Sequence, residues 1–329
     1  MNILVTLSES VKKTFLTEEI TRRIESMGSI TWNSSILTED DLRENIKGID
    51  ICITGWGTPR FSEKVLENAD SLKLVAHTAG TVGHMVSDEF FARGIRVVSA
   101  NKVFAESVAE SVIGYLLTVL RDIPYYTNKM KSGGWKDPDY YNRGLLDQEI
   151  GLIGFGEIPR YLVPMLKPFR AKIKAFDKYV DAAAMAEYGV EKAAIDEIFA
   201  ACPIISVHLP ATEETRHMID KKLLESLRDD AVFINTSRGS VIDEDALLEV
   251  LKKKTGVRAV LDVFQKEPLP DNSPFRKLDN AYLIPHMAGP TVDRRKYATM
   301  AVLDDIDNFM NNRPLIHEIS AEKASRMTR

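Results

Sequence analysis

Short apolar runs alternate with segments of helical periodicity along most of the chain. Apolar runs of strand length lie at residues 2–7, 51–54, 72–76, 95–98, 150–153, 173–176, 204–207, 231–235, 258–261 and 281–284. Between them, the sequence predicts helices at 17–26, 62–69, 104–120, 195–200, 221–227, 243–253 and 291–312. Strands that alternate with helices in this way predict α/β domains with parallel, doubly wound sheets and right-handed crossovers.

Residues 149–179 predict a strand, a glycine turn, a helix and a second strand, which together form a βαβ unit. Gly154 and Gly156 follow the first strand, and Asp177 ends the second. Glycines at a helix N-terminus leave backbone amides free, and the positive end of the helix dipole favours a pyrophosphate there. Asp177 stands about twenty residues further on, where a carboxylate accepts hydrogen bonds from a ribose. The stretch therefore predicts dinucleotide binding, although a lone Gly-x-Gly also occurs in ordinary tight turns.

Two prolines depart from the usual form of this fingerprint. Pro159 replaces its third glycine, but that position serves helix packing rather than the phosphate, and proline is tolerated in the first turn of a helix. Pro164 falls inside the predicted helix. We therefore expect Pro164 to kink or shorten the helix.

The length of 329 residues exceeds one typical hydrophobic core and predicts two domains. Segment 104–120 carries apolar residues around most of its circumference, as expected of a long buried helix that joins two domains. We place the hinge just before it. The smaller α/β domain then comprises residues 1–100 and 291–329, and the dinucleotide-binding Rossmann domain comprises residues 101–290.

Composition narrows the class of protein further. Hydrophobic residues make up 44% and charged residues 28% of the chain, and the net charge of −5 gives no reason to expect nucleic acid. Cys52 and Cys202 both lie in or beside apolar runs, so we expect core residues rather than a disulfide framework or a metal site. The N-terminus resembles a strand rather than a leader, and no run of about eighteen apolar residues predicts a membrane span. These features favour a cytoplasmic protein without a membrane partner.

Polar groups follow three successive strands of the larger predicted sheet. Arg238, Asp262 with Glu267, and His286 each come after one of these strands. Because parallel strands end at the same edge of a sheet, we expect all of these groups beside the dinucleotide. A guanidinium can hold a carboxylate, a histidine can donate a proton near neutral pH, and a carboxylate beside the histidine favours its charged form. Together the groups predict hydride transfer, although each one alone is typical of an ordinary loop.

No His, Asp or Glu group has the spacing of metal ligands, so we expect no metal. In the smaller domain, Thr78, Ala79 and Gly80 form a loop after a strand, and their amides could hold an anion or simply form a turn. Trp56 and Arg60 follow another strand, and we expect them to face the substrate and read its variable end. A Trp56 ring that anchors the loop on its own domain is equally consistent with the Gly-Trp-Gly turn.

Five motifs, taken in order and spacing, resemble those of the D-isomer-specific 2-hydroxyacid dehydrogenase family, which includes enzymes of the phosphoglycerate, glycerate and D-lactate dehydrogenase kind. They are GFG at 154–156, HLPATEET at 208–215, NTSRGSVIDEDAL at 235–247, LDVFQKEP at 261–268 and PHMAG at 285–289. The resemblance covers most of residues 100–290, and the first hundred residues are similar mainly in architecture. It implies an NAD-dependent enzyme that interconverts a D-2-hydroxy acid and a 2-oxo acid. It also implies two Rossmann-like domains with the active site in the cleft between them.

The resemblance assigns roles to individual residues. It implies that Arg238 binds the substrate carboxylate, that His286 is the acid/base and that Glu267 orients it. The cofactor contacts that it implies are Gly154, Phe155, Gly156, Glu157, Ile158, Asp177, Leu209, Thr236 and Asp262. In the family, backbone around Thr78, Ala79 and Gly80 helps to hold the substrate carboxylate. The usual glycines and following aspartate are absent here, so the identity of the substrate stays open.

Asp177 predicts NAD rather than NADP. Its carboxylate can accept bonds from the ribose hydroxyls, whereas a 2′-phosphate would place a dianion against it. Lys178 follows immediately and could soften that repulsion.

Three alternatives remain open at this point. His208 competes with His286 as the catalytic histidine, but its place in the HLP loop resembles a wall of the cofactor site. A dinucleotide-sensing binding protein of the corepressor type would keep the same site without significant turnover. Formate oxidation is disfavoured because those relatives carry glutamine where this chain has Glu267.

Residues 125–147 are polar and aromatic, with turn formers at Gly133–Gly134 and Asp137–Asp139. We read this segment as an arm that contacts a second subunit and therefore expect a homodimer. A surface loop without a partner would have much the same composition.

Overall fold

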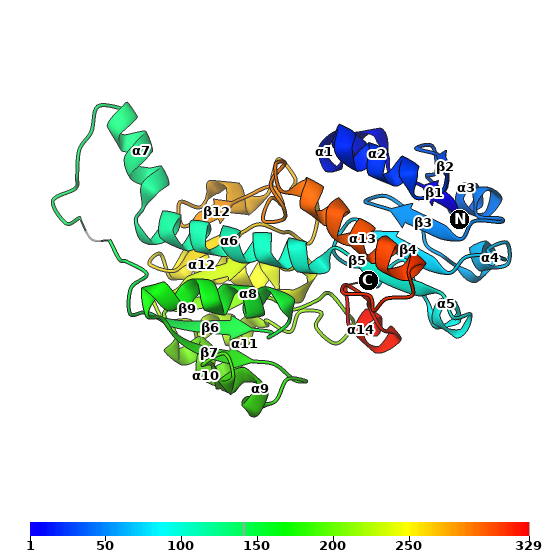
Figure 1. Cartoon of the computed structure of the whole chain (residues 1–329). Helices are drawn as coiled ribbons and strands as arrows, with labels where there is room; N and C mark the ends of the chain where they lie inside the picture. The colour runs from blue at the N-terminus through cyan, green and yellow to red at the C-terminus, as the bar shows by residue number, and fades with distance from the viewer. Residues whose placement is uncertain (141, 329) are drawn as a thin grey trace. The chain divides into compact units, whose positions relative to one another are not determined.

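The computed structural model describes residues 1–140 and 142–328, which form two compact units (Figure 1). The smaller unit comprises Met1–Ala105 and Pro290–Arg329, and the larger comprises Glu106–Gly289. The border lies inside helix α6 (Asn101–Leu120). The sequence analysis expected it before this helix, after residue 100. The first turn of α6 places Val103 and Phe104 against the core of the smaller unit, which explains the difference.

The smaller unit contains a five-stranded parallel sheet in the order β2-β1-β3-β4-β5 (Figure 1). Its strands are β1 (Asn2–Val5), β2 (Ser29–Trp32), β3 (Ile51–Thr54), β4 (Leu74–His77) and β5 (Arg96–Ser99). Its helices are α1 (Glu9–Phe15), α2 (Glu18–Ser26), α3 (Glu39–Asn45), α4 (Glu63–Leu66), α5 (Asp88–Ala92), α13 (Arg295–Met310) and α14 (Ala321–Ser325). Alternate strand residues enter two different apolar clusters, so both faces of the sheet are buried.

The larger unit contains a seven-stranded parallel sheet in the order β12-β11-β10-β9-β6-β7-β8. Its strands are β6 (Glu149–Ile153), β7 (Lys172–Phe176), β8 (Glu191–Lys192), β9 (Ile204–Val207), β10 (Val232–Asn235), β11 (Arg258–Leu261) and β12 (Ala281–Leu283). Its helices, besides most of α6, are α7 (Ile123–Lys131), α8 (Glu157–Leu166), α9 (Ala182–Ala186), α10 (Ile195–Ala201), α11 (Lys221–Glu225) and α12 (Glu244–Lys253). One apolar cluster joins α6 and α8 to the sheet, and another joins α10, α11 and α12 to it.

Helices therefore cover both faces of the larger sheet, and the predicted doubly wound α/β class is confirmed. Cys52 and Cys202 are both buried free thiols in apolar clusters, as expected for core residues. Pro159 occupies the first turn of α8, and the helix ends two residues after Pro164, where a 3-10 turn (Lys167–Phe169) continues it. The expectation that Pro164 shortens the helix agrees with this ending.

Several elements escaped the sequence analysis. Strand β2 is an edge strand whose residues are exposed or half-buried, so it lacks an apolar run. Helix α3 begins with a capping box between Thr38 and Asp41 and buries a single side chain, Leu42. Helix α7 begins just before the segment read as an irregular arm and continues into it, and it buries none of its side chains. In each case the element lacks the apolar periodicity on which a prediction depends.

Helix α6 is the one helix in the described residues that is long and apolar enough to cross a membrane. Core helices of soluble proteins have the same length and composition, so this property is weak evidence for a membrane span. Ala109, Val112, Leu116 and Val119 of α6 belong to the core of the larger unit. Burial against the sheet thus accounts for the apolar character of the helix.

Candidate active site

The glycine turn after β6 has the form expected of a phosphate-binding turn. Gly154 has a φ of +97°, and a Cβ atom at this position would lie 2.8 Å from the carbonyl oxygen of His208. Only glycine therefore fits without a shift of the backbone. Gly156 caps α8, and within the described chain the amides of Gly156 and Ile158 have no hydrogen-bond acceptor. These free donors lie at the positive end of the helix dipole.

Phe155 shapes the turn. Its side chain is fully buried and meets Tyr188 edge to face, with the ring centroids 5.6 Å apart. Its amide donates to Asp177 Oδ2 at 2.8 Å. Both groups thus have a structural role, and the expected cofactor contact of Phe155 stays a prediction.

Asp177 uses its carboxylate mainly to hold the backbone. Besides the Phe155 amide, it accepts bonds at Oδ1 from the amides of Tyr179 at 2.8 Å and Val180 at 3.0 Å. An ionised carboxylate offers about four acceptor sites. One site therefore remains for a ribose hydroxyl, so the predicted ribose contact stays possible beside a structural role that the sequence analysis missed.

Three buried polar side chains stand at the ends of β9 and β10 without partners. Ser206 Oγ, Thr236 Oγ1 and both ring nitrogens of His208 make no hydrogen bond in the described chain. Buried polar groups are normally satisfied, so this cluster fits a ligand that supplies the missing partners. Leu209 is also buried beside them, with 8% exposure. Burial lowers the pKa of His208 to about 3, so its ring is neutral at physiological pH.

Arg238 lies in the turn after β10, and its conformation is locked by neighbours. Asn235 Nδ2 donates to the Arg238 carbonyl at 3.0 Å, and Asn235 Oδ1 accepts from the amide of Ser237 at 3.0 Å. A Cβ atom on Gly239 would lie 1.9 Å from the carbonyl carbon of Phe264, so the Arg238 turn and the loop that carries Glu267 are in tight contact.

The Arg238 guanidinium is mostly buried and only partly paired. Nη1 donates to the Ser237 carbonyl at 2.7 Å, while Nε and Nη2 have no acceptor in the described chain. Burial lowers the pKa of Arg238, and the nearby Glu267 carboxylate opposes that change. The side chain stays cationic at neutral pH because arginine starts from a very high pKa. A desolvated cation with free donors is suited to a carboxylate.

His286 and Glu267 form a hydrogen-bonded pair. His286 Nδ1 lies 2.7 Å from Glu267 Oε2, and Glu267 Oε1 accepts from the Phe264 amide at 3.0 Å. The ring is half-exposed, and its Nε2 has no partner in the described chain. An acceptor at Nδ1 favours the tautomer with hydrogen on that nitrogen. Nε2 is therefore the atom that can exchange a proton with a substrate.

Asp262 holds the loop that presents His286. Its carboxylate is buried, and it accepts from the amide of Met287 at 2.7 Å and from that of Ala288 at 3.1 Å. Tyr115 of α6 adds its hydroxyl at 3.3 Å. Burial raises the pKa of Tyr115, and the Asp262 carboxylate raises it further. Asp262 thus has a positioning role, which the sequence analysis missed together with Tyr115, and its expected cofactor contact stays a prediction.

Glu244, at the start of α12, is a further group that the sequence did not single out. Its Oε1 accepts from the amide of Gln265 at 2.7 Å and so fixes the loop that leads to Glu267. Burial raises the pKa of Glu244, against the effect of the Gln265 bond. In the sequence, Glu244 resembles any acidic residue in the first turn of a helix, so no signal distinguished it.

In the smaller unit, the loop after β4 provides free amides at two of the three expected positions. Thr78 is fully buried, and both its amide and its hydroxyl donate to the Thr54 carbonyl, at 2.8 and 3.0 Å. Both donors of Thr78 are therefore used within the loop, and its expected substrate contact stays a prediction. The amides of Ala79 and Gly80 have no acceptor among the described residues. The Gly80 carbonyl accepts from Ser99 Oγ at 2.9 Å, which holds the loop in place.

Trp56 belongs to an aromatic group beside this loop. It meets Phe15 and Phe104 edge to face, at centroid distances of 5.0 and 5.9 Å, and it remains 44% exposed. The Arg295 guanidinium lies 5.3 Å from its ring. A Cβ atom on Gly80 would lie 3.6 Å from the Phe104 ring, so Trp56, Phe104 and Gly80 form one continuous surface. Trp56 is thus both anchored on its own unit and partly exposed.

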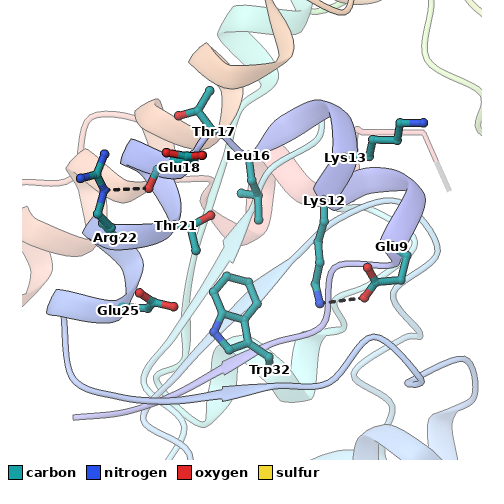
Figure 2. Close-up of a pocket in the computed structure, with 10 residues that line it drawn as sticks. All are labelled: Glu9, Lys12, Lys13, Leu16, Thr17, Glu18, Thr21, Arg22, Glu25 and Trp32. Carbon is teal, nitrogen blue, oxygen red and sulfur yellow. Dashed lines mark hydrogen bonds and ion pairs between the residues drawn. The ribbon is translucent and has the colours of Figure 1, made fainter.

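Arg60 lines a different hollow, together with His84, Ser87 and Ser325, and Trp56 does not contribute to it. The expectation that Trp56 and Arg60 read the variable end of the substrate stays a prediction. A wider hollow of about 790 Å³ lies between α1, α2 and β2 (Figure 2). There Lys12 Nζ donates to Glu9 at 3.0 Å and to Ser34 at 2.6 Å, so its charge is already neutralised.

Among the described residues, no group of three or more His, Cys, Asp and Glu side chains could hold a metal ion. The chemical groups that the structure brings together in the larger unit are the glycine turn, Asp177, Arg238 and the His286–Glu267 pair. They lie after strands of one parallel sheet, at the edge where such sheets bind ligands.

Comparison with known proteins adds independent evidence. Residues 113–288 match the model of the family described as D-isomer specific 2-hydroxyacid dehydrogenase, NAD binding domain. The chain is 32% identical to D-3-phosphoglycerate dehydrogenase of Methanocaldococcus jannaschii over 298 residues, which are 90% of this chain and 56% of that protein. It is 33% identical to glyoxylate reductase of Thermofilum pendens over 267 residues, which are 79% of this chain and 78% of that protein.

A solved structure of similar fold is an acyclic imino acid reductase in complex with NADPH and D-Arg. The TM-score is 0.83 at 24% sequence identity, with 97% of this chain and 100% of that chain covered. At this identity the likeness concerns the fold alone. The chain spans about half the length of the phosphoglycerate dehydrogenase that it matches, but most of the glyoxylate reductase.

Proposed function

This chain belongs to the D-isomer specific 2-hydroxyacid dehydrogenase family, and from that premise we propose that it is an NAD-dependent oxidoreductase that interconverts a D-2-hydroxy acid and a 2-oxo acid. The family match confirms the resemblance seen in the sequence and the prediction of NAD. The observation that carries the proposal is the His286–Glu267 pair, held at 2.7 Å beside the partly unpaired guanidinium of Arg238.

The residues present fit a dinucleotide. Gly154 allows the close backbone approach, and the free amides of Gly156 and Ile158 suit a pyrophosphate. Asp177 retains one acceptor site for a ribose, and the unpaired Thr236 hydroxyl and His208 ring offer further polar partners. Backbone at Glu157 and the side chain of Leu209 complete the proposed contacts. The nicotinamide, when bound, supplies or accepts the hydride at C2 of the substrate.

The protein side chains bind, orient and exchange a proton. Arg238 binds the substrate carboxylate through Nε and Nη2 and polarises the carbonyl, because both donors are free and desolvated. His286 Nε2 donates a proton to the carbonyl oxygen during reduction and removes one during oxidation. Glu267 keeps the imidazole oriented and stabilises its charged form. The free amides of Ala79 and Gly80 are proposed to bind the substrate carboxylate as well.

His286 suits this role better than His208. The His208 ring is buried and neutral, with a pKa of about 3, and has no carboxylate partner. His286 has both an exposed nitrogen and a carboxylate to stabilise its positive charge. The alternative of a sensing protein without turnover has no support from the named relatives, which are a dehydrogenase and a reductase.

We also propose that the chain forms a homodimer through its arm. Ile123, Tyr125, Met130, Trp135 and Tyr140 all expose large apolar side chains there. Such a patch favours a protein partner, and symmetric dimers are the commonest assembly. A cytoplasmic location is proposed together with it, because both cysteines are free thiols. Light scattering of Trp135→Ser beside the wild type tests the dimer.

A panel of 2-oxo acids, including glyoxylate, hydroxypyruvate and phosphorylated compounds, tests the activity by the loss of NADH absorbance. We expect at least one acid to be reduced to the D-2-hydroxy product. Tight NADH binding without turnover on the whole panel would favour the sensing alternative instead.

A further inference from the structure

The order in which strands are added to the larger sheet reverses at β6. This strand lies between β7 and β9, and the chain passes from β6 to β7 on one side before it crosses to β9 on the other. In doubly wound sheets, dinucleotides bind beyond the carboxyl ends of the strands at this switch point. The loops after β7 and β9, at residues 177–180 and 208–216, therefore flank the position of the adenosine half.

Three side chains join these two loops, and we call them the clasp: Lys178 and Tyr179 after β7, and Glu214 after β9. The Lys178 ammonium forms an ion pair with the Glu214 carboxylate. The Tyr179 hydroxyl donates to Glu214 Oε2 at 2.6 Å, and Lys178 Nζ lies 5.5 Å from the centre of the Tyr179 ring. The Glu214 carboxylate thus binds the side chains of both Lys178 and Tyr179 in the facing loop.

The backbone on each side of the clasp is fixed. Asp177 Oδ1 accepts from the amides of Tyr179 and Val180, and Lys192 Nζ donates to the Val180 carbonyl at 2.6 Å. On the other loop, the Thr215 hydroxyl donates to the Pro210 carbonyl at 2.6 Å. The clasp therefore joins two ordered loops. The hydrogen bond from Lys178 lowers the pKa of Glu214, and the hydrogen bond to Glu214 raises the pKa of Lys178.

We propose that Glu214 is a specificity-determining residue for the cofactor, because it occupies the one cation next to Asp177 in the β7 loop and so disfavours the 2′-phosphate of NADP. This inference rests on the proposed dinucleotide binding. Asp177 and Glu214 together carry two negative charges against the single positive charge of Lys178. A 2′-phosphate at the ribose would therefore meet the Asp177 carboxylate and a lysine already paired.

Replacement of Glu214 by glutamine tests this proposal directly. Glu214→Gln removes one negative charge and releases Lys178 to pair with the 2′-phosphate. Because the groups are exposed and screened by salt, we expect a moderate effect, in which the ratio of the NADPH to the NADH dissociation constant falls about five-fold. Nicotinamide fluorescence measures both constants without turnover. As a second probe, 2′,5′-ADP and 5′-AMP differ only in the 2′-phosphate, and calorimetry gives their affinities.

Glu213→Gln is the matched control. Glu213 is the adjacent residue, it carries the same charge, and its side chain is 92% exposed beside Arg216 rather than Lys178. We expect the ratio in this variant to stay near that of the wild type. Lys178→Gln should leave the preference for NADH intact or stronger, because it removes the only cation of the clasp. Tyr179→Phe should leave the ratio near that of the wild type, because Glu214 keeps its charge and its ion pair with Lys178.

A ratio in Glu214→Gln that changes no more than in Glu213→Gln overturns the proposal. If the wild type binds NADH and the ratio is unchanged, the inference about Glu214 fails and the proposed function stands. If the wild type binds neither dinucleotide, the proposed function fails, and the inference fails with it.

Discussion

The larger and smaller units use the ends of parallel strands in opposite ways. In the larger unit, the carboxylates of Asp177, Asp262 and Glu267 each accept from one or more backbone amides, and the loops around His286 are fixed. In the smaller unit, the amides of Ala79 and Gly80 are left free, beside the half-exposed ring of Trp56. One unit thus holds reactive groups in place, while the other offers a surface to a ligand.

This difference suggests a division of labour. Proton exchange needs a donor placed within hydrogen-bond distance, so its residues must be positioned by several bonds each. Substrate selection needs shape and charge at the variable end, which can change without a change in chemistry. Changes in the larger unit should therefore lower turnover on every substrate, and changes in the smaller unit should alter the ranking of substrates.

The largest effect is expected at Arg238. Arg238→Lys keeps the positive charge but loses the planar set of guanidinium donors. A single ammonium group cannot replace both Nε and Nη2 as hydrogen-bond donors to a carboxylate. Two bonds to a charged group correspond to about 4 kcal/mol, so kcat/KM should fall about 1,000-fold for every 2-oxo acid. Steady-state kinetics measure this fall in kcat/KM, with Arg216→Lys as the control. A loss confined to some substrates would place Arg238 in selection rather than in chemistry.

Asp305 of the smaller unit resembles Asp262 in that its carboxylate accepts from backbone amides. Its replacement should affect the stability of the fold and not the chemistry. Its buried carboxylate accepts from the amides of Ile316 and His317, at 2.6 and 2.9 Å, and from the His317 ring at 2.8 Å. Asp305→Asn should lower the free energy of unfolding by about 3 kcal/mol at pH 7, because an amide cannot accept all three bonds. Urea unfolding measures the change.

The pH dependence of this stability difference follows from the direction in which the pKa of Asp305 is shifted. Burial alone would raise the pKa of Asp305, but the bonds from His317 and Ile316 outweigh burial and lower it. A carboxyl group with a depressed pKa stabilises the fold fully above its unfolded pKa of about 3.9, and this stabilisation is lost as pH falls through the folded pKa. The difference between wild type and Asp305→Asn should therefore shrink at pH 3. An unchanged difference would show that the bonds are not those of an ionised carboxylate.

Asp262→Asn should separate positioning from cofactor binding. The amide group cannot accept from both Met287 and Ala288, so the His286 loop loses its anchor. We expect kcat to fall about 100-fold, since a misplaced acid loses most of its benefit. The dissociation constant of NADH should change less than three-fold, because a loop without direct contact to the cofactor should alter the binding free energy by no more than about 0.6 kcal/mol. A parallel loss of NADH affinity would restore the cofactor contact that the sequence suggested for Asp262.

The smallest effect is expected at Trp56, in the smaller unit. Trp56→Ala removes part of the aromatic surface beside Gly80 and should change the relative kcat/KM of large and small 2-oxo acids about ten-fold. Turnover of the smallest acid should remain. If the ranking of the panel is the same in this variant, the ring serves only to anchor its loop.

The sequence was sufficient to predict the fold because buried parallel strands leave apolar runs that alternate with helices. It also predicted Arg238, Glu267 and His286, since each follows such a strand and strand order places them at one edge. The structure shows the pairing of Glu267 with His286 that the family resemblance implied.

The sequence could not predict which polar groups serve the backbone. Phe155, Thr78 and Asp262 were expected to contact ligands, and the structure adds that their donors or acceptors bind neighbouring backbone. Such bonds depend on loop conformation, which leaves no periodic pattern. Glu244 and Glu214 were missed for the same reason, because acidic residues are common in loops and first helical turns, and only their neighbours distinguish them.

The central claim is that His286, oriented by Glu267, exchanges the proton. The most direct measurement is the single-turnover rate of NADH oxidation by His286→Ala, with the NADH dissociation constant measured in parallel and His217→Ala as a control with a similar positive φ. We predict a rate loss of about 1,000-fold in His286→Ala alone, with NADH affinity within about two-fold of the wild type. Undiminished hydride transfer in His286→Ala would contradict the assignment.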